Sequence, residues 1–269
     1  MKKQILLRVL IVLVLLGSLS YIVYKDYKQV NNANAPFVNS SATSTVAANT
    51  ASKPALVATS TNPYKVPEKP ALIAPTPDLN RSYNPPENFS DSKKNELKKR
   101  YSDEVLSLKK DPEQINTWFD LAILRKTAGD YEGARDIWIF TSKVWPQIPV
   151  SFIGLGDVYT FNLKDLPKAE ENLKIAVLIS PQDASMYARL SEFYRFRYPE
   201  KKSEALPTLL SGLKLNPKST DFMVVIAYYY QDTGDKVNAR TYFEMALAIA
   251  KDNKNTALIN YLNQDLKDL

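Results

Sequence analysis

The side chains of this sequence best suited to acid–base chemistry are carboxylates, because its 269 residues include no histidine and no cysteine. Ser-His-Asp triads, Cys-His pairs and histidine-containing zinc sites are therefore excluded by composition. Two pairs of neighbouring carboxylates, Asp103–Glu104 and Glu170–Glu171, have the residue types of an acid–base pair. Neighbouring side chains on a helix diverge by about 100°, so neither pair converges on one substrate. We assign no catalytic residue, no cofactor and no metal site, and expect a protein that is not an enzyme.

A second candidate chemistry is nucleic-acid binding, for which the segment YRFRYPEKK at 194–202 interleaves basic and aromatic side chains. The net charge of +6 points the same way, but its distribution does not. Residues 1–90 hold nine Lys/Arg and four Asp/Glu, whereas residues 91–269 hold 26 and 25. The part expected to fold is close to neutral and offers no basic footprint for phosphates. We expect no nucleic-acid partner.

The elements that carry these residues repeat along the chain. The segments AGDYEGARDIW at 128–138 and TGDKVNARTYF at 233–243 are close copies that begin 105 residues apart. Pro146, Pro181 and Pro217 are spaced by 35 and 36 residues. A small residue recurs with spacings of 35, 36 and 34 residues, at Ala134, Ala169, Ala205 and Ala239. The distance of 105 residues is therefore three periods of about 35.

Each period predicts two helices joined by a turn. The first helix starts with a large residue, which is Trp118, Phe152, Tyr187 or Met223. Three residues later the chain has Leu121, Leu155, Leu190 or Ile226, each followed directly by a small residue. Four residues after this leucine or isoleucine it has Arg125, Tyr159, Tyr194 or Tyr230. In the second helix, four residues after the alanine come Trp138, Leu173, Leu209 or Phe243. Steps of three and four place these side chains on one stripe, where large and small residues interlock.

The extra residues of the longer units fall at one place. From the alanine of a unit to the large residue of the next the distance is always 18 residues. From the Arg125/Tyr position to the alanine it is 9, 10, 11 and 9 residues. The insertions therefore belong to the turn inside a unit, since exposed turns tolerate changes of length that packed helices do not.

This pattern resembles the tetratricopeptide repeat family over about residues 115–251. The resemblance implies an all-α fold, an α-solenoid of about four units. The units are expected at about 115–148, 149–183, 184–219 and 220–253. Arg125 in a tyrosine position and Lys251 in a proline position depart from the family pattern. Pro207 is also unusual, and requires the second helix of its unit to begin near Ser203 or Glu204.

Capping helices are expected at both ends of the array. Residues 91–112 place Leu97, Tyr101, Val105 and Leu108 on one stripe. At the other end, a helix at about 256–268 places Leu258, Leu262 and Leu266 on one side. Such helices cover the apolar face of a terminal unit and keep the array soluble. The folded domain is thus expected to span residues 91–269.

The resemblance also implies a concave groove lined by the first helices, in which the family holds peptides or partner helices. Side chains off the packing stripe follow the i, i+4, i+7 spacing in each first helix. They are Phe119, Ile123, Lys126, Ile153, Asp157, Thr160, Ala188, Glu192, Arg195, Val224, Tyr228 and Gln231. We expect these residues to bind a protein or peptide partner, with Phe161 and Phe196 at the rim.

The amino-terminal residues 1–30 predict a transmembrane anchor with a cytoplasmic tip. Residues 5–24 contain one charge, Arg8, and 20 helical residues span about 30 Å, the thickness of a bilayer core. A cleaved signal peptide is the alternative, with a weak cleavage site at 18–20. The positive charges that precede the span keep the amino terminus inside the cytoplasm. The folded domain would then lie outside the cytoplasmic membrane.

Residues 31–90 predict a disordered linker. They contain nine prolines and many Ser, Thr, Ala and Asn residues, which cannot bury enough apolar surface to offset their ordering entropy.

Together these features predict a scaffold, anchored in the membrane, that binds a peptide or partner protein in the groove of its helical array. Two alternatives stay open. One is a carboxylate-dependent hydrolase of the cell envelope, which requires two convergent, buried carboxylates in a cleft. The other is a self-associating structural module whose groove holds another copy of the chain.

Overall fold

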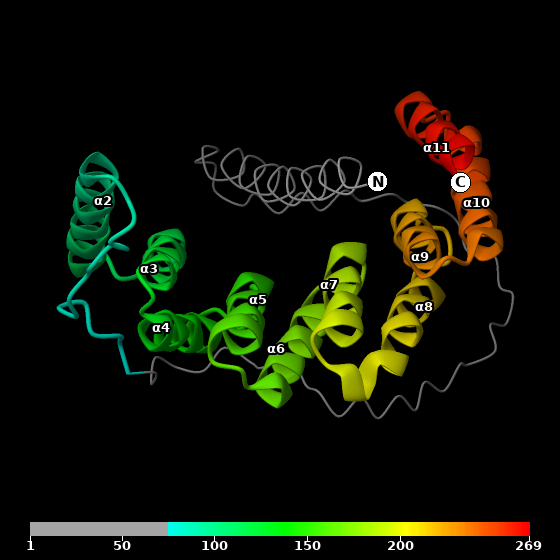
Figure 1. Cartoon of the computed structure of the whole chain (residues 1–269). Helices are drawn as coiled ribbons and strands as arrows, with labels where there is room; N and C mark the ends of the chain where they lie inside the picture. The colour runs from blue at the N-terminus through cyan, green and yellow to red at the C-terminus, as the bar shows by residue number, and fades with distance from the viewer. Residues whose placement is uncertain (1–74) are drawn as a thin grey trace, which may run out of the picture. The chain divides into compact units, whose positions relative to one another are not determined.

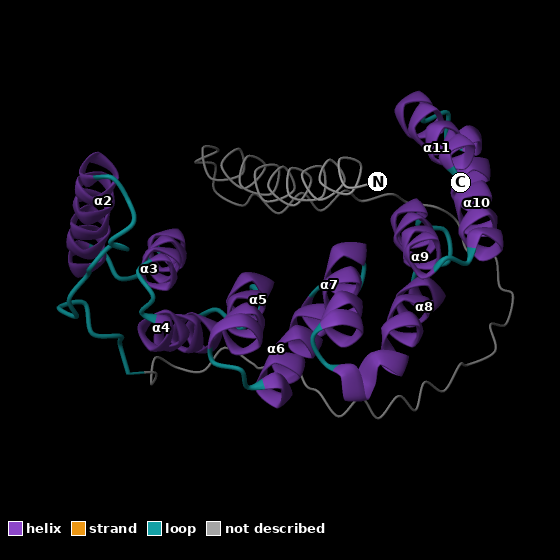
Figure 2. Ribbon diagram, in the orientation of Figure 1, coloured by secondary structure: helices purple, strands orange, loops and turns teal. Residues whose placement is uncertain are grey.

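The structure, a computed structural model, describes residues 75–269, and these residues form helices and connecting segments without strands (Figure 2). The predicted anchor at 5–24 and the predicted linker up to residue 74 lie outside the described residues. Within residues 75–269, no helix combines the length and the apolar character needed to span a membrane.

Ten α-helices follow one another in the described part of the chain (Figure 1). A leading helix, α2 (Asp91–Lys110), precedes four helix pairs. The pairs are α3 (Ile115–Thr127) with α4 (Tyr131–Val144), α5 (Pro149–Asp157) with α6 (Leu166–Ile179), α7 (Ala184–Phe196) with α8 (Ala205–Leu215), and α9 (Thr220–Thr233) with α10 (Lys236–Asp252). The last helix is α11 (Thr256–Asp268), and every helix contacts the next one along the chain. In Figure 1, α3 and α5 lie on one side of the array and α4 and α6 on the other.

Four of the connections between helices use the same two devices. A residue with left-handed backbone ends the turn at Gly129 (φ 80°), Lys164 (φ 59°), Gly234 (φ 84°) and Lys254 (φ 55°). The next residue, Asp130, Asp165, Asp235 or Asn255, accepts a hydrogen bond from the first turn of the following helix. Glycine reaches this conformation without a steric penalty, and an Asp or Asn cap satisfies an orphan N–H group. These two requirements explain the Gly-Asp pairs of the copied segments.

The inserted residues lie inside the second and third units, where the sequence predicts them. The second unit continues α5 as a π-helix, η1 (Val158–Asn162), in which the Leu163 N–H donates to the Val158 carbonyl at 2.9 Å. The third unit forms a 3-10 helix, η2 (Pro199–Glu204), which leads directly into α8. Pro207 is therefore the third residue of α8, in the first turn, where its missing N–H leaves no hydrogen bond unmade.

The ordered domain begins earlier than expected, because residues 75–90 pack on the first helices instead of continuing the linker. The Asp78 carbonyl accepts from the Arg125 guanidinium at 3.0 Å, and the Arg81 carbonyl accepts from the Tyr101 hydroxyl at 2.8 Å. The ring of Tyr83 stacks on that of Tyr101 with 4.4 Å between centroids. The proline content of this segment suggested disorder, but its backbone carbonyls find donors on α2 and α3, and Leu79, Tyr83 and Phe89 pack against the core, so hydrogen bonds and apolar burial together oppose the ordering entropy.

The hydrophobic core runs along the array in three clusters that follow the chain. One contains α2 and most of the first two units, a second joins Tyr187 and Leu209 to Phe222, and a third joins Met223 and Phe243 to Leu262 of α11. Leu213 and Tyr229 pack against more than one of them. Each unit therefore shields the apolar face of its neighbour, as expected for a repeat protein.

Candidate interaction surface

The positions that repeat in the sequence are the positions that pack. All four large residues at the start of the first helices are at most 4% exposed, and the four second-helix alanines are fully buried. The small residues are needed for close packing: a Cβ atom on Gly212 would lie 2.1 Å from the ring of Phe222, and one on Gly156 would lie 2.7 Å from Leu173. Bulky side chains of one helix fill the space above small residues of the other. The described residues therefore form stacked helix pairs with the packing that the tetratricopeptide resemblance implies.

Comparisons with known proteins gave structural likenesses only. No family model matches the chain, and no curated protein matches it. A crystal structure of MamA is 18% identical, with 62% of this chain and 99% of that one covered and a TM-score of 0.40. A thermophilic tetratricopeptide repeat protein of Thermus thermophilus is 22% identical over 56% of this chain and 82% of its own, with a TM-score of 0.35. YrrB, described as a repeat protein with an unusual peptide-binding site, is 13% identical, with 60% of this chain and 97% of that one covered and a TM-score of 0.32.

The first-helix face of the helical array consists of the predicted groove residues on α3, α5, α7 and α9. Two of the twelve are buried. Phe119 is 8% exposed, with its ring 5.4 Å from that of Trp138, and the buried Thr160 hydroxyl donates to the Gly156 carbonyl at 2.6 Å. These two positions are packing residues, and their assignment to the lining of a groove is wrong. The other ten are at least partly exposed, and they are Ile123, Lys126, Ile153, Asp157, Ala188, Glu192, Arg195, Val224, Tyr228 and Gln231.

Charged side chains on this face bridge successive first helices. Asp157 of α5 accepts from Arg189 of α7 at 3.1 Å. Arg195 of α7 contacts Asp232 of α9, also at 3.1 Å. These charges of both signs, which the sequence suggested as partner contacts, are thus already paired with a neighbouring unit. Exposed pairs of this kind contribute up to about 1 kcal/mol each, so they orient the helices more than they stabilise them.

Between α3 and α5 the described residues form no such bridge, and the face there is apolar. Ile123 is 50% exposed and Ile153 is half-buried. Lys126, one turn beyond Ile123, forms no ion pair with any residue of the described part. This stretch of the first-helix face combines an exposed isoleucine with a lysine that has no ion-pair partner among the described residues. On α7 and α9, by contrast, charged side chains of the face already form ion pairs with a neighbouring unit.

Glu192 lies among the charges of α7 and α9. Burial raises the pKa of its carboxyl, although Arg189 and Arg195 oppose this and Asp232 adds to it. The residue as a whole is exposed, so the flanking helices remove only part of the water around it. The result is a carboxylate that a cationic group of a partner would stabilise.

Tyr228 is held by the capping helix. Its hydroxyl donates to the Asp265 carboxylate at 2.7 Å and contacts the Tyr261 hydroxyl, both on α11. Its ring packs edge-on against Phe243 with 5.2 Å between centroids. Burial, assisted by these two partners, raises the pKa of Tyr228 far above its ordinary value. The sequence placed Tyr228 on the correct face but did not reveal α11 as its neighbour, because the contact spans 37 residues.

The carboxylates of the described residues do not form the pair that a hydrolase of the predicted type requires. Glu170 is the one buried carboxylate between residues 75 and 269, and it borders a cavity of about 470 Å³. Lys174 at 2.6 Å, Lys201 and the Tyr194 hydroxyl at 2.9 Å surround it. Glu200 and Glu204 also line this cavity, but both are exposed, so the cavity contains no pair of buried carboxylates.

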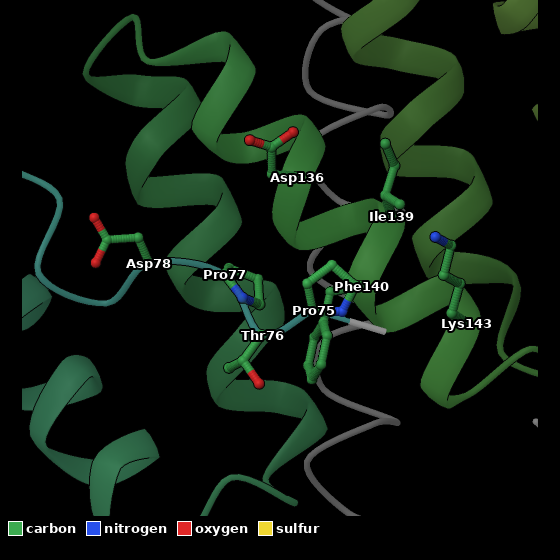
Figure 3. Close-up of a pocket in the computed structure, with 8 residues that line it drawn as sticks. All are labelled: Pro75, Thr76, Pro77, Asp78, Asp136, Ile139, Phe140 and Lys143. Carbon is green, nitrogen blue, oxygen red and sulfur yellow. The ribbon is translucent and has the colours of Figure 1, made fainter. Parts of the chain in front are cut away.

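A second cavity, of about 280 Å³, lies between the leading segment and α4 (Figure 3). Pro75 and Pro77 form one wall, and Ile139 and Phe140 form part of the other. The three charged side chains labelled in Figure 3 lie apart from one another around the cavity. They are Asp78, Asp136 and Lys143. This cavity therefore offers a mainly apolar recess without a convergent set of reactive groups.

Proposed function

We propose that the protein is an interaction scaffold that binds a segment of a partner protein, as an extended peptide or a helix, on its first-helix face. The observation that carries the proposal is the apolar stretch between α3 and α5. Ile123 of α3 is half exposed, Ile153 of α5 is partly exposed, and no ion pair between described residues joins the two helices. An apolar surface rimmed by polar side chains is typical of a docking site, and an amphipathic partner would bury it.

The partner proposed for this stretch presents an apolar side chain beside an acidic one. The apolar group would contact Ile123 and Ile153, and the acidic group would pair with Lys126. Burying one large apolar side chain contributes about 1.5–3 kcal/mol, which is a weak interaction by itself. Several units would therefore have to contribute, as the length of the array allows.

We further propose that the array is displayed outside the cytoplasmic membrane by an anchor at residues 5–24, with the amino terminus inside. Support for this comes from the sequence: a stretch of 20 residues with one charge, preceded by Lys2 and Lys3. The proline-rich residues that follow would act as a spacer between the bilayer and the array.

Site-specific photocrosslinking in intact cells tests both parts of this proposal. A photoreactive residue at Ile123 of the full chain should give a discrete adduct with a partner. Substitution Ile153→Asp in the same chain should remove that adduct, because it places a charge in the apolar stretch. Protease added outside the cytoplasmic membrane should release the crosslinked domain.

The matched control is a photoreactive residue at Val237 of α10, an apolar side chain that is 77% exposed and lies off the first-helix face. It should give no adduct. Equal adducts from Ile123 and Val237, or an adduct that survives Ile153→Asp, would show that the partner binds elsewhere.

A further inference from the structure

The two units with longer internal turns share a second feature. The residue two positions after the tyrosine position is Phe161 in the second unit and Phe196 in the third. In the first and fourth units, whose turns are short, the same position holds Thr127 and Asp232. Phe161 lies inside the π-helix η1, and Phe196 is the last residue of α7, shortly before η2.

Both phenylalanines are exposed, and each carries an arginine on its ring. Phe161 is 46% exposed and Phe196 is 57% exposed. The Arg197 guanidinium lies 4.8 Å from the centre of the Phe161 ring, and that of Arg195 lies 4.6 Å from the centre of the Phe196 ring. Arg197 follows Phe196 in the chain and reaches back to the ring of Phe161 in the preceding unit. We call Phe161, Phe196 and Arg197 the docking edge.

The two arginines differ in the charge that they leave available. Arg195 is already paired with Asp232. Arg197 is exposed and forms no ion pair within residues 75–269. Lys164, in the turn three residues after Phe161, is likewise exposed and without an ion pair in the described part. The docking edge thus joins two exposed aromatic rings to positive charge that is not neutralised.

We propose that the docking edge binds an acidic segment of a partner protein, in which carboxylates pair with Arg197 and apolar side chains cover the two rings. A guanidinium already stacked on a ring is oriented to receive a carboxylate, and covering the rings removes apolar surface from water. This site adjoins the first-helix face, because Arg195 of that face stacks on Phe196, but it shares no residue with the apolar stretch at Ile123 and Ile153.

Charge favours this occupant over two others. Residues 1–74 of the same chain hold eight Lys/Arg and two Asp/Glu, so Arg197 would repel them on balance. A nucleic acid would need several phosphate contacts, whereas Asp232 and Glu192 lie close to Arg195. An acidic peptide needs only one or two cations beside an apolar surface.

Fluorescence anisotropy with the full chain tests the proposal. The probes are a short fluorescein-labelled peptide in which pairs of Glu and Leu alternate, the same peptide with Lys in place of Glu, and a labelled oligouridylate. We expect the acidic peptide to bind most tightly. Substitution Arg197→Glu should weaken its binding by about tenfold, the effect of replacing one attractive charge pair by a repulsive one, and should shift the preference to the Lys peptide.

The control is Lys218→Glu, the same change of charge at an exposed position in the turn between α8 and α9. It should leave the preference for the acidic peptide in place, and Phe161→Ala should weaken binding without reversing it. Failure of the acidic peptide to bind, tighter binding of the oligouridylate, or equal effects of Arg197→Glu and Lys218→Glu would overturn the proposal. Ile123→Asp should leave binding of this probe unchanged, which keeps the test independent of the first-helix face.

Discussion

At the scale of single residues, Arg125 shows why a repeat departs from its pattern. The equivalent position holds tyrosine in the other three units, but the first unit has residues 75–90 beside it. The buried guanidinium donates to the Asp78 carbonyl, to the Tyr101 hydroxyl at 2.7 Å and to the Asp130 carboxylate at 2.9 Å. A tyrosine has a single hydroxyl and could not satisfy all three acceptors. The departure therefore joins the leading segment to the array.

We expect Arg125→Ala to lower the free energy of unfolding by about 3 kcal/mol, because it leaves buried acceptors without a donor. Urea denaturation of the full chain, followed by circular dichroism, measures the change. Arg135→Ala is the matched control, since Arg135 pairs with Asp136 at 2.8 Å on the surface and should contribute less than about 1 kcal/mol. Equal decreases in the free energy of unfolding for the two variants would mean that the buried contacts of Arg125 stabilise the fold no more than a surface ion pair does.

At the scale of elements, the inserted turns are fastened to the array by particular side chains. Glu170 of α6 binds Lys201 of η2 and Tyr194 of α7, so one carboxylate joins three elements. Burial alone would raise the pKa of Glu170, but hydrogen bonds from Lys174, Lys201 and Tyr194 outweigh it and lower the pKa below the ordinary value of 4.5. The charged form is therefore the one that the fold stabilises.

This pKa gives a pH dependence with a definite sign. Because the folded pKa is depressed, the contribution of Glu170 is fully present above the unfolded pKa of about 4.5 and is lost as the pH falls through the folded pKa. At pH 7 we expect Glu170→Gln to cost about 2 kcal/mol of unfolding free energy, as for hydrogen bonds to a charged group. The difference from wild type should shrink as the pH is lowered below about 4.5.

Urea midpoints of wild type and variant across this pH range measure the effect. Glu171→Gln, the exposed neighbour, serves as the control and should show little difference at any pH. If the difference in urea midpoint between wild type and Glu170→Gln stays constant down to the lowest pH, the network does not depend on the charge of this carboxylate.

At the scale of the whole described domain, stability is shared between neighbouring units along a line. The three core clusters succeed one another, and α11 completes the last of them through the fully buried Leu262. In such an array, removal of an end affects its neighbour first and distant units little. Loss of α11 would also free the Tyr228 hydroxyl from Asp265.

We expect a chain that ends after Lys254 to have a free energy of unfolding about 4 kcal/mol lower for its last unit, because it lacks one buried and two half-buried leucines of α11. Hydrogen exchange should show faster exchange of amides in α9 and α10, while α3 and α4 keep their protection. Thermal melting gives an independent measure. Leu262→Ala should reproduce part of the effect and Asn263→Ala none of it, and uniform loss of protection along the array would contradict a linear arrangement.

The sequence predicts the repeating part of this architecture well and the particular contacts poorly. The large, small and alanine positions of the four units are buried as predicted, and α11 lies where a capping helix was expected. Local rules suffice for these features, since a stripe of side chains every three or four residues defines a helix face and its partner. Phe119 and Thr160 were misplaced, because i, i+4, i+7 spacing identifies a face but not what covers it.

The sequence by itself therefore determined that the chain forms stacked helix pairs with a period of about 35, because helical periodicity and turn chemistry are local properties. Only the tertiary structure decided that residues 75–90 join the domain, that α11 covers Tyr228 and that Arg197 reaches the ring of Phe161. Each of these depends on contacts between residues more than 30 positions apart, such as Asp78 with Arg125. Such contacts leave no periodic pattern in the sequence, since their free energy arises only when the packed units bring the partners together.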